Sequence, residues 1–209
     1  QIIEGDAEAD ATPAGKIRLL RQAADLHTEK LNDAATAASL LEKASELAPE
    51  DRELLLALCD AYTASGRSDD SIRALERIVA SYGGKRSKDL SAIQYRLGKA
   101  FLSKGDKDRA LTELDAAFKI DPGSVPVLRD LGLLTFEMGD YERAGKTFRS
   151  LLLQRDTSGS ITKAEVFYYL GEISHRQSDK AKAIQMLERS IEADGSLQKA
   201  RDLLAQLKG

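Results

Sequence analysis

A spacing of small, apolar and turn-forming residues recurs along this chain, and it is most regular between residues 94 and 122. In order, its positions are Leu97, Gly98, Phe101, Gly105, Asp106, Ala110, Leu114, Ala117 and Pro122. Apolar residues three or four positions apart share one face of an α-helix. Gly105 interrupts this period where the chain can reverse, because glycine accepts a left-handed backbone at little cost. The stretch therefore predicts two amphipathic helices joined by a tight turn.

The turn position of this unit recurs at regular intervals. The equivalent turn residues are Asn32, Gly66, Gly105, Gly139 and Ser178, at intervals of 34, 39, 34 and 39 positions. A period near 34 residues is typical of helical repeats, in which each unit buries its apolar face against its neighbours. The longer intervals predict additional residues at two junctions, after Val79 and after Leu152.

The pattern resembles the tetratricopeptide repeat, which has leucine-glycine, an aromatic residue, alanine, a further bulky residue and a closing proline at these spacings. The leading tryptophan of that repeat is replaced here by Gln94. The resemblance implies an all-α fold, a right-handed α-solenoid of about five helix-turn-helix repeats with a C-terminal capping helix. It does not identify a partner, because one repeat fold serves many functions.

The spacing divides the chain into a short flank, five repeats and a cap. The predicted linker is 1–12, the repeats are 13–50, 51–86, 87–124, 125–158 and 159–195, and the capping helix is 196–209. The first repeat is degenerate, because one residue has been added near its turn. The chain also lacks an initiator methionine, which suggests a piece excised from a longer protein or a processed chain.

Three signals predict where helices begin. Thr12 is followed by proline, which suits a threonine cap with proline at the first helical position. Thr162 and Glu165 have the spacing of a capping box. After the turn at residue 66, Ser68 or Asp69 is expected to cap the next helix.

Composition restricts the classes of partner. The formal net charge is -3, with 31% charged and 42% hydrophobic residues. A general nucleic-acid-binding surface has no support from this charge. No hydrophobic run approaches the length of a membrane span, so direct membrane insertion is not expected. The single cysteine, Cys59, excludes an intrachain disulfide and favours a reducing, cytoplasmic environment, with packing as the expected role of its side chain.

The sequence contains no pattern that predicts an enzyme. The two histidines, His27 and His175, belong to different repeats and have no second ligand at metal-binding spacing. Phosphate loops, dinucleotide fingerprints and nucleophile elbows are also absent. We therefore expect no catalytic residue, no cofactor and no metal ion.

The resemblance implies that the first helix of each repeat lines a concave face. Residues beside the core stripe of those helices lie about 80 to 140° away from it, so they are available for contact with a partner. The candidate partner-binding residues are Tyr95, Lys99, Leu102, Arg129, Leu133, Phe136, Tyr168, Glu172, His175 and Arg176, with Leu56, Asp60 and Thr63 as further candidates in the second repeat. Aromatic anchors with a polar rim are typical of peptide recognition. The alternative is that the aromatic residues only fill space between successive repeats.

These observations predict a non-enzymatic scaffold that binds a peptide segment or a partner protein on its concave face. The cations of the third and fourth repeats favour an acidic or carboxylate-bearing segment. Some family members clamp a C-terminal carboxylate with asparagines, which this chain lacks apart from Asn32 in a turn. A structural spacer or self-assembly segment of a longer repeat protein, and a regulatory accessory subunit, stay open as alternatives. Homo-oligomerisation stays open as well.

Overall fold

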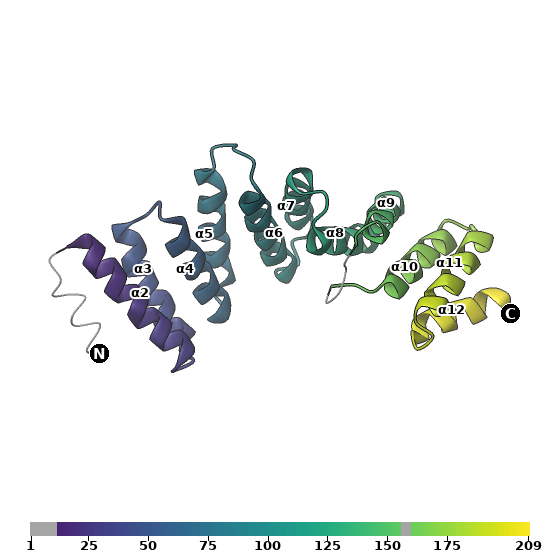
Figure 1. Ribbon diagram of the computed structural model, residues 1–209, viewed down its shortest axis with the longest axis horizontal. Helices are drawn as coiled ribbons and strands as arrows, with labels where there is room; N and C mark the ends of the chain where they lie inside the picture. The colour runs from purple at the N-terminus through teal and green to yellow at the C-terminus, as the bar shows by residue number, and fades with distance from the viewer. Residues whose placement is uncertain (1–11, 156–159) are drawn as a thin grey trace. The chain divides into compact units, whose positions relative to one another are not determined.

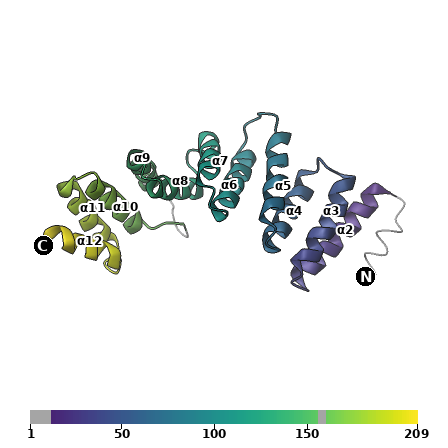
Figure 2. The same ribbon diagram turned by 180° about the vertical axis from the view of Figure 1, so that it is seen from behind.

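The computed structural model describes residues 12–155 and 160–209, and within these ranges the regular structure is entirely α-helical. The eleven described helices are α2 (Pro13–Glu29), α3 (Ala34–Leu47), α4 (Arg52–Ala64), α5 (Ser68–Ser81), α6 (Lys88–Ser103), α7 (Lys107–Ile120), α8 (Val125–Glu137), α9 (Tyr141–Leu152), α10 (Lys163–Arg176), α11 (Lys180–Ala193) and α12 (Gln198–Lys208). They follow one another in antiparallel pairs, with α12 after the last pair (Figure 1, and Figure 2 from behind). The predicted all-α fold is confirmed.

The predicted turns have the backbone that their sequence requires. Asn32, Gly66, Gly105, Gly139 and Ser178 all adopt positive φ angles, between 50° and 83°. At each of these turns, the left-handed conformation lets the chain reverse direction between two helices within a few residues. Within residues 12–155 and 160–209, no helix is both long enough and apolar enough to span a membrane.

The chain divides into two compact units, Gln1–Ala110 and Leu111–Gly209, and the division falls within α7. In the first unit each helix from α2 to α5 packs on the next, so that the series ends with α6. Its core includes Leu54, Leu55, Leu75, Ile78, Leu97 and Phe101, all nearly inaccessible to solvent. Cys59 is completely buried among them, and burial raises the pKa of its thiol to about 11. An un-ionised, buried thiol is a packing group rather than a nucleophile.

Two of the three predicted helix starts are confirmed. The Thr12 hydroxyl accepts a hydrogen bond of 3.1 Å from the Gly15 amide at the start of α2. Thr162 and Glu165 form the complete capping box at the start of α10, each bonding to the other's backbone amide. These contacts satisfy amide groups that a helix leaves without an internal partner.

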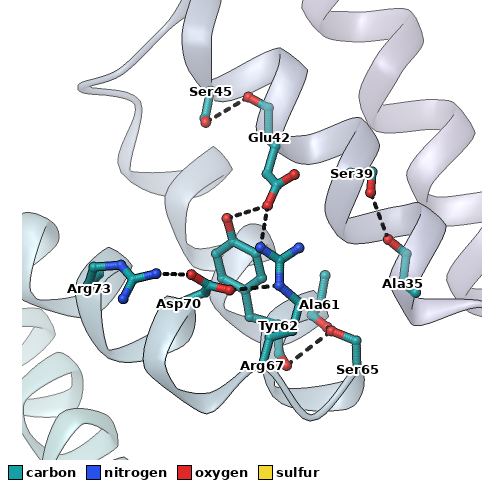
Figure 3. A network of polar contacts seen from close by, with 10 residues as sticks. All are labelled: Ala35, Ser39, Glu42, Ser45, Ala61, Tyr62, Ser65, Arg67, Asp70 and Arg73. Carbon is teal, nitrogen blue, oxygen red and sulfur yellow. Dashed lines mark hydrogen bonds and ion pairs between the residues drawn. The ribbon is translucent and has the colours of Figure 1, made fainter.

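The third predicted start is wrong. Helix α5 begins at Ser68, and the cap position is occupied by Arg67, whose side chain makes no capping bond. Its guanidinium instead bonds the carboxylates of Glu42 (2.8 Å) and Asp70 (2.7 Å). Asp70 also pairs with Arg73 (Figure 3). A polar network that links α3 to α5 has replaced the local cap.

Tyr62 completes this network from α4, as Figure 3 shows. Its hydroxyl donates a hydrogen bond of 2.9 Å to Glu42, and the Arg67 guanidinium lies 4.6 Å from the centroid of its ring. Burial first, and then the bond to Glu42, raise the pKa of Tyr62 to about 12. Three successive helices are therefore tied together by one phenol and its charged neighbours.

We expect Tyr62 to make the folded state sensitive to high pH. An unfolded tyrosine loses its proton near pH ~10, whereas folded Tyr62 keeps it until about 12. Between these values the unfolded chain binds fewer protons, so the free energy of unfolding falls as pH rises. Tyr62→Phe should make that fall less steep. Urea unfolding at several pH values between 9 and ~12 measures this pH dependence of the free energy of unfolding. The control is Tyr82→Phe, because Tyr82 follows α5 and lies outside the network. Equal slopes in wild type and Tyr62→Phe would contradict the assignment.

The second unit is organised around Phe148, which is 0% exposed. Its ring stacks on Tyr169 at a centroid distance of 5.0 Å and an interplanar angle of 6°. A Cβ atom at Gly132 would lie 2.9 Å from Phe148, and one at Gly171 would lie 2.9 Å from Leu187. The glycines of the leucine-glycine pairs are thus required because the second helix of each pair approaches too closely for a side chain.

Helix α12 ends the described chain and packs on α11. Ala200 and Leu207 are buried, and Leu203 and Leu204 are half-buried against the same cluster. The predicted helix over 196–209 is observed as Gln198–Lys208. Its apolar face covers the last helix pair, which is the role expected of a capping helix.

Candidate functional site

The candidate residues are divided between the two units. In the first unit a groove of about 320 Å³ lies between α4 and α6, with the start of α5 at its base. Lys99, Asp60 and Thr63 line it, whereas Tyr95 and Leu102 are half-buried outside its lining. Asp60 forms an ion pair across the groove with Arg96. The lining of this groove contains no aromatic side chain.

In the second unit a groove of about 530 Å³ lies between α10 and α12, and we call it the α10–α12 groove. Its lining consists of Tyr168, Glu172, His175 and Arg176 from α10 and of Lys199, Asp202, Leu203 and Gln206 from α12. All four candidates predicted on α10 are therefore brought together on one surface. The four from α12 were not predicted, because only the packing of α12 brings them beside α10.

Tyr168 and Lys199 form the aromatic and cationic centre of this groove. The Lys199 ammonium lies 4.5 Å from the ring centroid of Tyr168 and 4.9 Å from that of Tyr169. Burial, and after it the hydrogen bond and charge of Glu172, raise the pKa of Tyr168 above its usual range. Among the described residues Lys199 makes no ion pair with a carboxylate. Its positive charge is therefore available to a bound group.

Arg176 is held at the edge of the groove by groups from three helices. Its guanidinium pairs with Glu172 at 2.7 Å and donates a hydrogen bond of 3.3 Å to the Tyr141 hydroxyl. It also lies 5.4 Å from the ring centroid of Phe136. The bond to Glu172, followed by that to Tyr141, raises the pKa of Arg176. A cation fixed in this way presents its remaining N–H groups without first losing much rotamer freedom.

Phe136 and Leu133 lie outside the groove and pack against the core of the second unit. The Phe136 ring is 5.7 Å from Tyr141 and 5.4 Å from Tyr169, centroid to centroid. It therefore joins α8, α9 and α10, which is the space-filling role that the alternative interpretation described.

The Arg129 side chain contacts two neighbouring groups of the second unit. Its guanidinium bonds Asp130 at 2.6 Å and donates to the Ser160 hydroxyl at 3.2 Å. Asp130 is only 6% exposed. A buried carboxylate needs a compensating charge, so Arg129 neutralises its neighbour and does not line either groove.

The described residues contain no group of three or more acidic, histidine or cysteine side chains arranged to hold a metal ion. His27 lies 3.4 Å from Asp33 in the first unit, and His175 lines the α10–α12 groove in the second. The α10–α12 groove presents aromatic, cationic and hydrogen-bonding groups on one surface.

Sequence comparison identifies the family. Models of the tetratricopeptide repeat match residues 30–93, 95–161 and 129–198. The chain therefore belongs to the tetratricopeptide repeat family, as its spacing predicted. Comparison with curated proteins found no match to this sequence.

Solved structures of the same fold are similar over most of this chain. YrrB, described as a TPR protein with an unusual peptide-binding site, matches with a TM-score of 0.71 and 18% identity over 97% of each chain. MamA from Desulfovibrio magneticus RS-1 matches at 0.66 and 16%, covering 87% of this chain and 96% of that one. The C-terminal part of a TPR repeat-containing protein from Cytophaga hutchinsonii matches at 0.65 and 18%, covering 89% and 69%. At these identities the likeness shows the fold.

Proposed function

We propose that the protein is a non-enzymatic interaction scaffold and that the α10–α12 groove binds a peptide segment of a partner protein. The observation that carries the proposal is the cation over the two tyrosine rings, Lys199 above Tyr168 and Tyr169. Arg176 and His175 supply further polar contacts along the same groove. The fold supports the proposal, because tetratricopeptide domains generally mediate protein–protein interactions. YrrB, which shares the fold, is described as having an unusual peptide-binding site.

The chemistry of the groove favours a segment that carries a carboxylate. Glu172 is engaged by Arg176, and Asp202 accepts a hydrogen bond of 2.6 Å from Gln198. Lys199 is thus the cation most available for an incoming carboxylate, while Tyr168 offers an apolar surface beside it. Charge-assisted hydrogen bonds of this kind are stronger than neutral ones.

The test is a photo-crosslinking experiment in the source cell. A benzoyl-phenylalanine introduced at Gln206, in the groove, should capture a partner that the same probe at Gln185, exposed on α11, does not. Binding of the captured partner is then measured with purified protein. Lys199→Glu should weaken it by at least about tenfold, a difference of ~1.4 kcal/mol.

Lys119→Glu is the matched control, because Lys119 is exposed on α7 of the same unit and lies outside the groove. It should leave the affinity within about a factor of two of wild type. Equal weakening by both substitutions would reject the groove as the binding site. Capture of a second copy of this chain would instead support the self-assembly alternative.

A further inference from the structure

A second groove lies on the other side of α10. It is bounded by α9, α10 and α11 of the second unit and has a volume of about 460 Å³. We call it the α9–α11 groove. Helix α10 contributes Phe167, Leu170 and Ser174 to this groove, and Tyr168 and Glu172 to the α10–α12 groove. At 100° per residue the two sets point about 150° apart. The two grooves are therefore separate surfaces, and one ligand side chain cannot occupy both.

The floor of the α9–α11 groove is apolar. Leu152 of α9, Phe167 and Ile173 of α10 and Met186 of α11 line it. Gly145 lines the α9 side of the groove. A cleft of this size with an apolar floor is in the range that proteins use for ligand side chains.

The rim of the groove carries an excess of positive charge. Arg149, Lys182 and Arg189 all line it, and none makes an ion pair with a carboxylate of the described residues. The Arg189 guanidinium lies over the Phe167 ring at 5.9 Å. The one carboxylate in the lining, Glu142, is already paired with Lys146 at 2.7 Å. The surface thus combines an apolar floor with cations whose charges are not balanced locally.

We propose that the α9–α11 groove docks a peptide segment of a partner protein in which one or two large apolar side chains are flanked by carboxylates. The apolar side chains would cover the floor formed by Phe167, Ile173 and Met186. The carboxylates would pair with Arg149, Lys182 and Arg189, which removes the repulsion among these cations. An amphipathic segment with apolar residues three or four positions apart meets both requirements at once. The chain would then hold two partner segments, one on each side of α10.

The test is a peptide-display selection against the full chain, using random twelve-residue peptides as the probe. Wild type should enrich peptides that combine leucine, isoleucine, phenylalanine or tryptophan with aspartate or glutamate. The selection is repeated on the double variant Lys182→Glu with Arg189→Glu, on Lys199→Glu, and on a control of the same charge change, Lys119→Glu with Arg201→Glu. The class of peptides that docks in the α9–α11 groove should disappear only when Lys182→Glu and Arg189→Glu are present.

The best peptide of that class is then titrated by fluorescence anisotropy. Lys182→Glu with Arg189→Glu should raise its Kd at least about tenfold. Met186→Ser should also weaken binding, whereas Lys199→Glu and the control pair should not. Circular dichroism checks that each variant keeps wild-type helicity, which is expected of the double variants because Lys182, Arg189, Lys119 and Arg201 are all exposed. Absence of an acidic-apolar class, or its survival on Lys182→Glu with Arg189→Glu, would overturn the proposal.

The two proposals fail separately. Loss of the class with Lys199→Glu alone would assign these peptides to the α10–α12 groove and reject the second site. Loss with Lys182→Glu and Arg189→Glu alone would establish the second site whether or not the first groove binds a partner.

Discussion

Replacing Phe148 with alanine is expected to lower the free energy of unfolding by about 3–5 kcal/mol. The ring is 0% exposed and stacks on Tyr169 at 5.0 Å. It also fills the space opposite Gly132, where no side chain is available to replace it. The walls of the resulting cavity are helices already held by their own backbone bonds, so they can close only part of it.

Urea unfolding followed by circular dichroism measures the loss, and hydrogen exchange locates it. Because repeat proteins are stabilised mainly by contacts between neighbours, the loss of protection should be concentrated in α8, α9 and α10. Leu153→Ala is the control, since Leu153 is 82% exposed and its removal should change stability by less than ~0.5 kcal/mol. A similar loss in both variants would show that the ring is not the centre of this core.

Replacing Arg129 with alanine is expected to cost about 3 kcal/mol, because it leaves the Asp130 carboxylate buried without its cation. Asp130 is 6% exposed and lies 2.6 Å from the Arg129 guanidinium. The repeat spacing predicts Arg129 as a partner-binding residue. Because Arg129→Ala is also expected to lower stability, weaker partner binding by this variant would not by itself show that Arg129 contacts the partner.

A double-mutant cycle separates the two roles. Asp130→Asn removes the charge that Arg129 balances, so Arg129→Ala should be milder in that background, with a coupling of at least ~1 kcal/mol. Thermal and urea unfolding give the free energies, and Arg201→Ala, at an exposed site on α12, is the control. A cost of Arg129→Ala below ~0.5 kcal/mol would show that Asp130 does not depend on this cation.

The local parts of the fold were predictable from the chain alone. The five turn residues, including Asn32 and Ser178, adopt the left-handed backbone that their spacing required. Thr12 and Thr162 cap helices as expected, because a cap depends on residues three positions away. The same local geometry placed Tyr168, Glu172, His175 and Arg176 together, since residues on one face of a helix stay together wherever the helix packs.

The rest of the candidate site depended on distant neighbours. Phe136 and Leu102 have the same position in their repeats, and the spacing predicted both for partner binding, yet Phe136 packs among rings from α9 and α10. Lys199 lies in the α10–α12 groove, although nothing in the sequence indicated that α12 would line it. Periodicity gives the direction of a side chain around its own helix and contains no information on which other helix it meets.

Sequence by itself determined the all-α repeat fold, the positions of its turns and two of its helix caps, because each follows from residues within one period. Only the tertiary structure decided that Arg67 forms a network with Glu42 and Asp70, that Arg129 neutralises a buried carboxylate, and that α10 has a groove on each side. The physical reason is that charge pairing and groove formation depend on the spatial approach of side chains from different helices, which a one-dimensional pattern does not specify.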